Sequence, residues 1–440
     1  MTPRMAAVLS LNSCFRNNKF ANIELDSAIK KYGFVELDKS FYTRLLYGTI
    51  ERKITLDYLI ACFSSVKPEK IEPLVFCILR TGLYQILYMD KVPDNAAVNE
   101  AVELCKALCP TAYAGYVNAV LRNLIRHKAD IPELLRKDGG LKSISLQYSI
   151  PLWILELWTQ DYGKERATAL AKYFCEREPF LTLRINTGKV KSEEFKENLG
   201  YDSVYGKFTQ SVLKLGGSFP AEDLYGYADG LFFVQDEASC LAASLLGPDQ
   251  ITTENPVILD VCACPGGKSF SVALNFGDKA RIHSFDLHEN RLKLIEKGAA
   301  RLGLTSITTY ARDARIPNEA FFGTADAVIC DVPCSGLGVI AKKPDIKFKK
   351  YEEIEKLPVV QYEIVKASAL SLKSGGSLIY STCTLRRAEN EEIVEKFIKE
   401  NEGYELSSTN LLNETDSGMV TFFPDLYDTD GFFVAKIKKK

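Results

Sequence analysis

Histidine and long apolar segments are scarce in this chain, and each scarcity excludes a class of protein. Only 3 histidines occur among 440 residues, and the 12 cysteines form no pair of C-x-x-C motifs, so we expect no metal site. No apolar stretch approaches the ~20 residues that cross a bilayer. The apolar run before Asn12 is too short for a signal peptide. We therefore expect a cytoplasmic protein whose cysteines are mostly free thiols.

Neither sign of charge dominates, because 55 basic residues are matched by 57 acidic ones and leave a net charge of −2. A protein that is basic all over is excluded. A nucleic-acid partner is not, since the clustering of basic residues matters more than their total. The basic clusters are Arg122, Arg126 and Lys128; Lys342, Lys343, Lys347, Lys349 and Lys350; Arg386 and Arg387; and the tail 436–440, for which we prefer a solvated surface.

The first half of the chain is predicted to be mainly helical. Its length and a hydrophobic content of 46% fit two to four globular domains. Residues 1–128 repeat apolar residues at three- and four-residue spacing, which predicts an all-α bundle. The segment 71–87 is too apolar for a surface helix and should lie at the centre of that bundle. Residues 129–234 begin as a charged linker and continue as a small α+β module that we expect to bind RNA.

Residues 235–440 change to a rhythm of strand, loop and helix. Short apolar runs occur at Val257–Val261, Ile282–Phe285, Ala327–Asp331 and Ser377–Tyr380. Each of the first three precedes a helical stretch, which is typical of a doubly wound, mostly parallel sheet of the Rossmann-like type. The sequence therefore predicts a third domain of the α/β class, closed by a last strand over 431–437.

A glycine pair, Gly266–Gly267, lies in the loop after the first of these strands. Glycines between a strand and a helix let the backbone approach a ligand closely. The ending Gly267–Lys268–Ser269 looks like a P-loop, but a P-loop requires glycine where Cys262 stands. The dinucleotide pattern G-x-G-x-x-G is also missing. The loop therefore predicts a ligand other than a nucleoside polyphosphate or a dinucleotide.

Aspartates mark the ends of the strands that follow: Asp286, Asp313 and Asp331. At the first position a carboxylate would bind ribose hydroxyls, and adenine would lie near the second. Taken singly, each is most often a turn or helix-cap residue. As an ordered set they favour a cationic sulfonium cofactor over a polyphosphate.

Two cysteines follow two of the predicted strands, Cys334 in Asp331–Gly336 and Cys383 in Ser381–Thr384. Strand ends of this kind meet in one crevice of an open α/β sheet. Two thiols beside a cofactor pocket suit methylation of carbon 5 of a pyrimidine. A thiolate that adds to carbon 6 makes carbon 5 nucleophilic enough to attack a sulfonium methyl group, and the thiol must then be expelled. Chemistry alone does not say which cysteine attacks.

These segments resemble the motifs of the RNA 5-methylcytosine methyltransferases, the Sun/Fmu and nucleolar-protein-2 superfamily. Asp331–Gly336 and Ser381–Cys383 are the most specific pieces. In the N-terminal half, Ile78–Gln85, Ala97–Val102 and Val117–Arg122 resemble the NusB-like RNA-binding domain. The fusion of the two is similar to the branch of the family that acts on 16S ribosomal RNA. The resemblance spans nearly the full length.

The resemblance implies a class I methyltransferase domain that takes S-adenosylmethionine and a 16S ribosomal RNA substrate. It makes Cys383 the nucleophile and gives Cys334 a role in product release. Asp331 would face the amino side of the cytosine and Lys268 its carbonyl side. Cys264 departs from the usual alanine without removing a functional group. The implied cofactor residues are Cys262, Ala263, Cys264, Pro265, Gly266, Gly267, Lys268, Asp286, Asp313 and Asp331.

Five basic residues are candidates for RNA contacts. Lys342, Lys343 and Lys347 directly follow the Cys334 loop and are placed to hold phosphates that flank the target base. Arg122 and Arg126 would contact RNA from the helical domain.

Three alternatives remain open. The first is the same chemistry on transfer RNA or on the large ribosomal RNA, and the second is a non-catalytic RNA-binding assembly factor. The paired cysteines and the three aspartates count against that second possibility. A DNA methyltransferase is disfavoured, because no target-recognition domain is recognisable. We expect a monomer.

Overall fold

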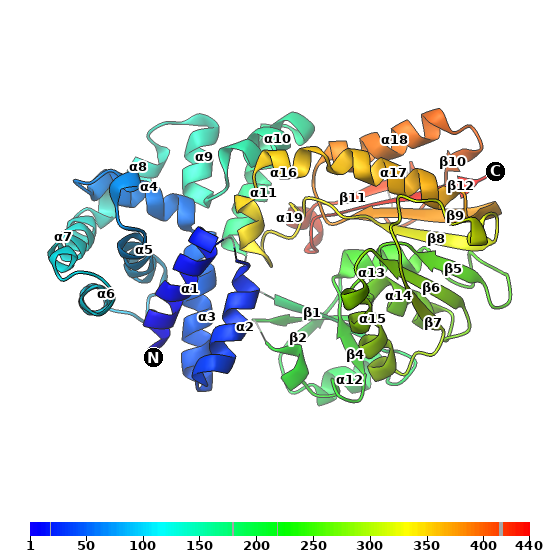
Figure 1. The fold of residues 1–440 in the computed structure, drawn as a ribbon, viewed down its shortest axis with the longest axis horizontal. Helices are drawn as coiled ribbons and strands as arrows, with labels where there is room; N and C mark the ends of the chain where they lie inside the picture. Colours follow the sequence, from blue (N-terminus) through cyan, green and yellow to red (C-terminus); the bar gives the residue numbers. More distant parts are fainter. Residues whose placement is uncertain (18, 178–179, 218, 413–416) are drawn as a thin grey trace. The chain divides into compact units, whose positions relative to one another are not determined.

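The computed structural model describes residues 1–440 except 18, 178–179, 218 and 413–416 (Figure 1). The chain forms two compact units. Unit 1 contains residues 1–176 and 340–349, and unit 2 contains residues 177–339 and 350–440. The short segment 340–349 therefore leaves unit 2, joins the helical unit and returns. Among the described residues, every helix is too short or too polar to span a bilayer.

Unit 1 is a bundle of helices built around α5 (Pro73–Tyr88), which packs against α1, α3, α4, α6 and α7. Nearly all of α5 from Val75 to Ile86 is buried, so the prediction of a central helix over 71–87 is confirmed. The expected linker after residue 128 is instead folded, because α8 and α9 follow there at once. The helices are α1 (Pro3–Asn17), α2 (Ala21–Tyr32), α3 (Glu36–Glu51), α4 (Lys53–Phe63), α5, α6 (Asp94–Leu108), α7 (Ala112–Arg126), α8 (Ile131–Arg136), α9 (Gly140–Tyr148), α10 (Leu152–Tyr162) and α11 (Lys164–Glu176), with short 3-10 turns at Pro68–Lys70, Lys128–Asp130 and Pro344–Phe348.

Unit 2 begins with a small antiparallel sheet in the order β2-β3-β1-β4. Its apolar face is covered by α12, whose Phe195 is fully buried against Leu183 and Phe232 of the sheet. The small α+β module expected over 129–234 is therefore shorter than predicted, because residues 129–176 belong to the helical unit 1. Its elements are β1 (Phe180–Ile185), α12 (Ser192–Asn198), β2 (Ser203–Tyr205), β3 (Val212–Gly216), a 3-10 turn at Ala221–Asp223 and β4 (Phe232–Val234).

The larger sheet of unit 2 has the order β10-β12-β9-β8-β5-β6-β7, with β11 paired to β12. The five strands from β9 to β7 are parallel, and β12 runs antiparallel to β9. Helices α13, α14 and α15 cover one face, and α17 and α18 cover the other (Figure 1). The predicted Rossmann-like fold with a mostly parallel sheet is confirmed. Its elements are α13 (Glu237–Ser244), β5 (Val257–Asp260), α14 (Gly267–Asn275), β6 (Arg281–Asp286), α15 (Glu289–Leu302), β7 (Ile307–Ala311), β8 (Ala325–Asp331), α16 (Tyr351–Glu355), α17 (Leu357–Ala369), β9 (Leu372–Thr382), α18 (Glu391–Glu400), β10 (Tyr404–Leu406), β11 (Met419–Phe422), α19 (Pro424–Tyr427) and β12 (Phe432–Lys439), with 3-10 turns at Glu319–Phe321 and Arg387–Glu389.

The strand order places a topological switch at β5, because the chain runs from β5 through β6 to β7 on one side and then returns to β8 on the other. In open α/β sheets, ligands bind outside the carboxyl ends of the strands at such a point. The fold therefore directs the search for a site to the residues that follow β5, β6, β8 and β9.

Candidate active site

Two cysteine sulfurs meet at the carboxyl edge of the larger sheet. Cys334 follows β8 by three residues, and Cys383 is the first residue after β9. The two strands are parallel neighbours in register from Val328 to Asp331, so their ends lie side by side. The Sγ atoms of Cys334 and Cys383 are 3.3 Å apart, within hydrogen-bonding distance of each other. The expected convergence of the two thiols is confirmed.

Backbone and hydroxyl contacts hold the two cysteine loops together. Ser335 Oγ and Thr384 Oγ1, which follow the two cysteines, are 2.6 Å apart. The Gly338 N–H donates to the Cys383 carbonyl over 3.0 Å, and the Gly338 carbonyl accepts from the Gly431 N–H over 2.8 Å. A Cβ atom at position 338 would overlap the Gly431 carbonyl and lie 2.9 Å from the Cys383 oxygen. Only glycine therefore allows these three segments to pack so closely.

An ion pair stands beside the sulfurs. Lys268 Nζ, on the first turn of α14, lies 2.7 Å from Asp331 Oδ2 and donates to Ser239 Oγ over 3.0 Å. The other carboxylate oxygen of Asp331 accepts from Ser381 Oγ over 2.9 Å. Lys268 is buried while about a third of the Asp331 side chain is exposed. The arrangement offers a buried cation and a partly accessible carboxylate within one site.

The two thiols differ in acidity. The hydrogen bond between the sulfurs, with Cys334 as donor, lowers the pKa of Cys383, and the Lys268 charge acts in the same direction. The same hydrogen bond, followed by burial and by the charges of Cys383, Glu389 and Asp331, raises the pKa of Cys334 well above its usual value. A thiolate is the nucleophilic form of cysteine. The pair is therefore arranged as one activated thiol beside one that keeps its proton.

The glycine loop after β5 has the backbone form that its sequence predicts. Gly266 adopts φ 111°, and a Cβ atom there would overlap the Phe270 ring. α14 begins at Gly267 directly after this left-handed residue. A loop without side chains at this bend leaves the backbone open to a ligand at the switch point.

The predicted carboxylates follow neighbouring strands along one edge of the sheet. Asp286 ends β6, is buried, and accepts from the His288 N–H over 2.9 Å, with Arg291 at 3.5 Å. Asp313 follows β7 and is held by Arg315, whose Nε and Nη2 lie 3.0 and 2.5 Å from its two oxygens. This side-chain pairing lowers the pKa of Asp313 and keeps it ionised. Acceptors for hydroxyl groups and for a cationic ligand are therefore present at the switch point, and they fit a sulfonium nucleoside.

Asp260 is a residue of this site that the sequence patterns did not single out. It ends β5, is fully buried, and accepts from Ser269 Oγ over 2.6 Å, while its Oδ1 has no hydrogen-bond partner among the residues that the structure describes. Burial raises its pKa from 3.8 to about 7, against the effect of the Ser269 hydrogen bond. The one sequence feature that marks Asp260 is its place at the end of a buried strand, immediately before the glycine loop.

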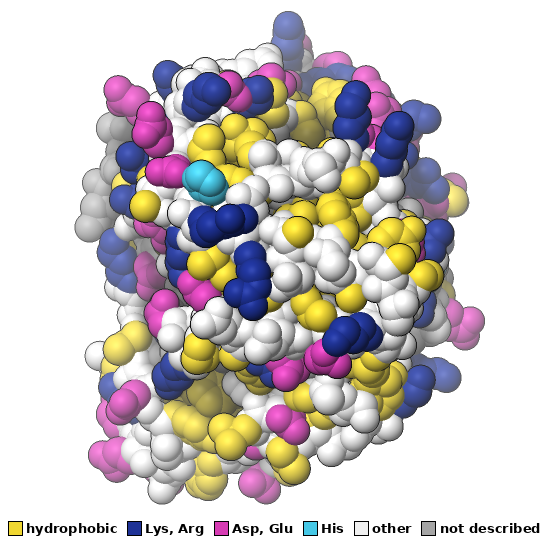
Figure 2. All heavy atoms as spheres, turned by 90° about the vertical axis from the view of Figure 1, so that its left-hand side faces the viewer, with side chains coloured by type: hydrophobic (Ala, Val, Ile, Leu, Met, Phe, Trp, Pro, Cys, Tyr) yellow, Lys and Arg dark blue, Asp and Glu magenta, His cyan; other side chains and the backbone are white. Residues whose placement is uncertain are grey.

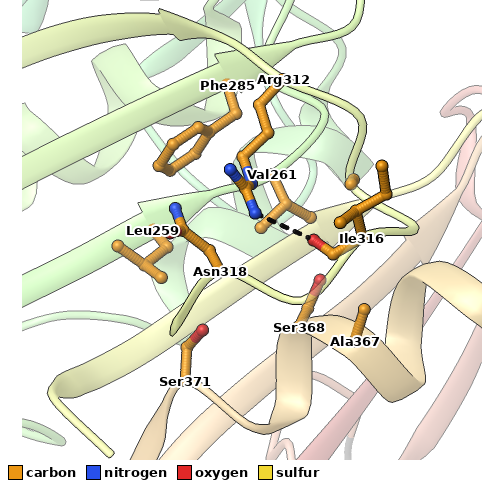
Figure 3. Close-up of a pocket in the computed structure, with 10 residues that line it drawn as sticks. Leu259, Val261, Phe285, Arg312, Ile316, Asn318, Ala367, Ser368 and Ser371 are labelled. Atoms are coloured by element: carbon orange, nitrogen blue, oxygen red, sulfur yellow. Dashed lines mark hydrogen bonds between the residues drawn. The ribbon is translucent and has the colours of Figure 1, made fainter. Parts of the chain in front are cut away.

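A small cavity of about 30 Å³ lies on the α17 side of the sheet (Figure 3). Leu259, Val261 and Phe285 form its floor, and Arg312 reaches across it to the Ile316 carbonyl at 3.5 Å. None of its lining residues belongs to the predicted site. Successive strand residues point to opposite faces, so the Asp260 side chain, between Leu259 and Val261, points away from this cavity. The cavity lies close to the cofactor residues in sequence but is separate from the cysteine pair.

The predicted RNA-binding residues fall into two groups. Arg122 and Arg126 are exposed on α7, and Lys343 is exposed in the segment 340–349. On the face over α6 and α7, Lys and Arg side chains stand in small groups among apolar and uncharged ones (Figure 2). The predicted RNA contact of Lys347 is wrong, because this residue is only 3% exposed. Its Nζ donates to the carbonyls of Glu51 and Ser149 at 2.7 and 2.9 Å. Its ammonium serves the packing of unit 1 and does not face a phosphate.

The sequence contained a signal for the burial of Lys347. Ile346 and Phe348 flank it, and the first is buried while the second packs on the core of unit 1. Lys342 is half-buried. A segment that alternates lysine with large apolar residues fits a segment packed on a core as well as a loop that binds phosphates. The charge count alone favoured phosphate contacts.

Comparison with known proteins gives two family matches. Residues 246–438 match the model of the 16S rRNA methyltransferase RsmB/F family, and residues 1–126 match the NusB family. The chain is 35% identical over 449 residues to the probable ribosomal RNA small subunit methyltransferase B of Bacillus subtilis (strain 168), covering 99% of this chain and 98% of that protein. It is 36% identical over 451 residues to the protein of the same description from Synechocystis sp., with full coverage of both chains.

Solved structures support the fold. The crystal structure of PH0851 superposes with a TM-score of 0.82 at 23% identity, covering 100% of this chain and 99% of that one. NSun6 from Pyrococcus horikoshii, solved with SFG, gives a TM-score of 0.57 at 23% identity and covers 66% of this chain and 98% of its own. At these identities the likeness concerns the fold alone.

Proposed function

The chain belongs to the 16S rRNA methyltransferase RsmB/F family of S-adenosylmethionine-dependent RNA methyltransferases, and from this premise we propose that it methylates carbon 5 of one cytosine in 16S ribosomal RNA. The observation that carries the proposal is the 3.3 Å distance between the sulfurs of Cys334 and Cys383. Methylation of a nucleophilic oxygen or nitrogen does not need two converging thiols, whereas carbon 5 of a pyrimidine needs one to add and then to leave. A ribosomal RNA substrate also implies a cytoplasmic location.

S-adenosylmethionine, when bound, supplies the electrophilic methyl group. The backbone from Cys262 to Lys268 would hold its methionine portion, Asp286 its ribose hydroxyls, and Asp313 the region of its adenine. These assignments follow the order of the strand ends. The donors and acceptors at this edge, with the glycine loop beside them, are the observations that support them.

Cys383 is the proposed nucleophile because the hydrogen bond from Cys334 lowers its pKa, and the Lys268 charge acts in the same direction. Its sulfur forms a bond to carbon 6 of the cytosine, and the electron pair of the 5,6 double bond becomes available at carbon 5. Asp331 accepts a hydrogen bond from the amino side of the ring, and Lys268 stabilises negative charge at its carbonyl side. Transfer of the methyl group then leaves carbon 5 with both a proton and a methyl group.

Product release reverses the addition. Cys334 passes its proton to the departing Cys383 sulfur, and the Cys334 sulfur takes up the proton from carbon 5. The electron pair of the carbon–hydrogen bond re-forms the 5,6 double bond as the bond from carbon 6 to Cys383 breaks. Cys334 assists this step from 3.3 Å away. The target base must leave any stacked helix to reach the two sulfurs. Lys342 and Lys343 are the proposed contacts to the flanking phosphates, and Arg122 and Arg126 of α7 are proposed as further RNA contacts.

The test combines a map of the modification with two variants. Bisulfite sequencing of ribosomal and transfer RNA should show that a deletion strain lacks one 5-methylcytosine that the parent strain has, and that this cytosine lies in 16S ribosomal RNA. Cys383→Ser should abolish methyl transfer and leave S-adenosylmethionine binding intact by calorimetry. Cys334→Ser should accumulate a covalent enzyme–RNA adduct, seen as a shifted band on a denaturing gel, because addition proceeds while elimination stalls.

Each outcome has a distinct meaning. Loss of a methyl group from transfer RNA or from the large ribosomal RNA would keep the chemistry and refute the target. Full activity of Cys383→Ser would refute its role as nucleophile. Absence of an adduct with Cys334→Ser would refute the role of that thiol in release.

A further inference from the structure

We propose that two adjacent buried residues, Glu389 and Asn390, position the cysteine loops against each other and keep the attacking role with Cys383. Both precede α18, and neither contacts a sulfur through a hydrogen bond. They are positioning residues, and the inference rests on the proposed function. The chemistry alone leaves open what makes two neighbouring thiols behave differently.

Glu389 holds the loop that carries Cys334. Its side chain is fully buried, and Oε2 accepts from the Ser335 N–H over 2.9 Å and from Gln361 Nε2 over 2.9 Å. Gln361 Nε2 also donates to the Pro333 carbonyl over 2.9 Å. The residues on both sides of Cys334 are therefore tied to one carboxylate, directly or through one amide.

Asn390 holds the loop that carries Cys383. Its Oδ1 accepts from Thr382 Oγ1 over 2.6 Å, and its Nδ2 donates to the Thr384 carbonyl over 3.0 Å. These two partners are the residues immediately before and after Cys383. Because Glu389 and Asn390 are consecutive, a single short turn fixes the backbone on both sides of both cysteines.

The same turn makes the charges around the two sulfurs unequal. Glu389 is the carboxylate attached to the Cys334 loop, and it is paired with Arg386 at 3.5 Å. Lys268 is the cation whose charge favours ionisation of Cys383. After the hydrogen bond that Cys334 donates to Cys383, burial and the Cys383 charge, the Glu389 charge also raises the pKa of Cys334. Asp331 raises the pKa of both thiols and so does not distinguish them.

The two thiols therefore have different roles, and the position of each thiol sets its role. The thiol beside the buried carboxylate keeps its proton and can donate it, while the thiol beside the lysine supplies the electron pair that attacks carbon 6. Buried polar networks of this kind fix geometry strongly, because an unpaired member is costly in a low-dielectric interior. Glu389→Gln is the informative change, since it removes the charge and keeps an oxygen that can accept from Ser335.

The test uses the full-length protein without RNA. Trace labelling with iodoacetamide, read by mass spectrometry of the two cysteine peptides, gives the ratio of Cys383 to Cys334 reactivity. Wild type should label mainly at Cys383. In Glu389→Gln the ratio should fall by roughly tenfold, which corresponds to one pKa unit of difference between the thiols. Glu395→Gln, an exposed residue of α18 with the same change of charge, should keep the wild-type ratio.

A second variant tests the other half of the turn. Asn390→Ala should lower the single-turnover rate of methyl transfer while the calorimetric affinity for S-adenosylmethionine stays at the wild-type value. An unchanged labelling ratio in Glu389→Gln, or a wild-type rate in Asn390→Ala, would overturn the inference. The labelling needs no RNA. If wild type failed to methylate any RNA, the proposed function would fail while the labelling ratio would still report on the role of Glu389.

Discussion

Asp260→Asn is expected to remove a pH-dependent cost to the stability of unit 2. The Asp260 carboxyl is fully buried at the end of β5, and burial raises its pKa from 3.8 to about 7. In the unfolded chain the group ionises near its ordinary value. Between these two values the folded state binds more protons than the unfolded state. Stability contributed by this group is therefore complete below pH 3.8 and is lost as the pH rises toward 7.

The magnitude follows from the shift. One pKa unit corresponds to about 1.36 kcal/mol, so the cost is ~1.6 kcal/mol at pH 5 and ~4 kcal/mol at pH 8. Asn cannot ionise, and its side-chain oxygen can still accept from Ser269. The difference in unfolding free energy between Asp260→Asn and wild type should therefore move by ~2.5 kcal/mol in favour of the variant between pH 5 and pH 8.

Hydrogen exchange of the β5 amides is the suitable assay. Both tryptophans, Trp153 and Trp158, lie in unit 1, so fluorescence would not report on this sheet. Comparing variant and wild type at each pH cancels the intrinsic pH dependence of exchange. Asp249→Asn, at an exposed position of unit 2, is the matched control and should show no such trend. A difference between Asp260→Asn and wild type that is the same at pH 5 and pH 8 would refute a raised pKa at Asp260.

Three further outcomes are expected. Burial lowers the pKa of Lys347 from 10.5 to about 8, so unit 1 should gain stability as the pH rises from 8 to 10.5. Unfolding followed by tryptophan fluorescence should show this gain in wild type and not in Lys347→Met. A gain that persists in the variant would contradict the lowered pKa. Gly338→Ala, whose Cβ would overlap the Gly431 carbonyl, should lower kcat at least ~10-fold without changing the affinity for S-adenosylmethionine, and wild-type turnover would count against the close packing. Lys268→Met should raise the pKa of Cys383, moving the midpoint of its pH-dependent alkylation upward; an unmoved midpoint would remove Lys268 from the activation of the thiol.

Much of the candidate site could be predicted because it depends on strand ends. The apolar runs marked where β5, β6, β8 and β9 lie, and parallel strands bring their carboxyl ends to one edge. The sequence therefore sufficed to bring Cys334 near Cys383 and to align three carboxylates. It did not indicate Asp260, because a polar residue at the end of a buried strand has the same local pattern whether it is solvated or enclosed.

The amino-acid sequence by itself determined the helical N-terminal bundle, the parallel α/β sheet and the loops that carry the reactive side chains. These features depend on local periodicity and on residues near one another in the chain. Only the tertiary structure decided that Lys347 is enclosed in unit 1 and that Glu389 and Asn390 hold both cysteine loops. Burial and charge around a side chain come from segments distant in sequence, such as Glu389 and Ser335, 54 residues apart. The local sequence thus shows which residues can react. The pKa that decides which of them does react depends on contacts between residues distant in sequence.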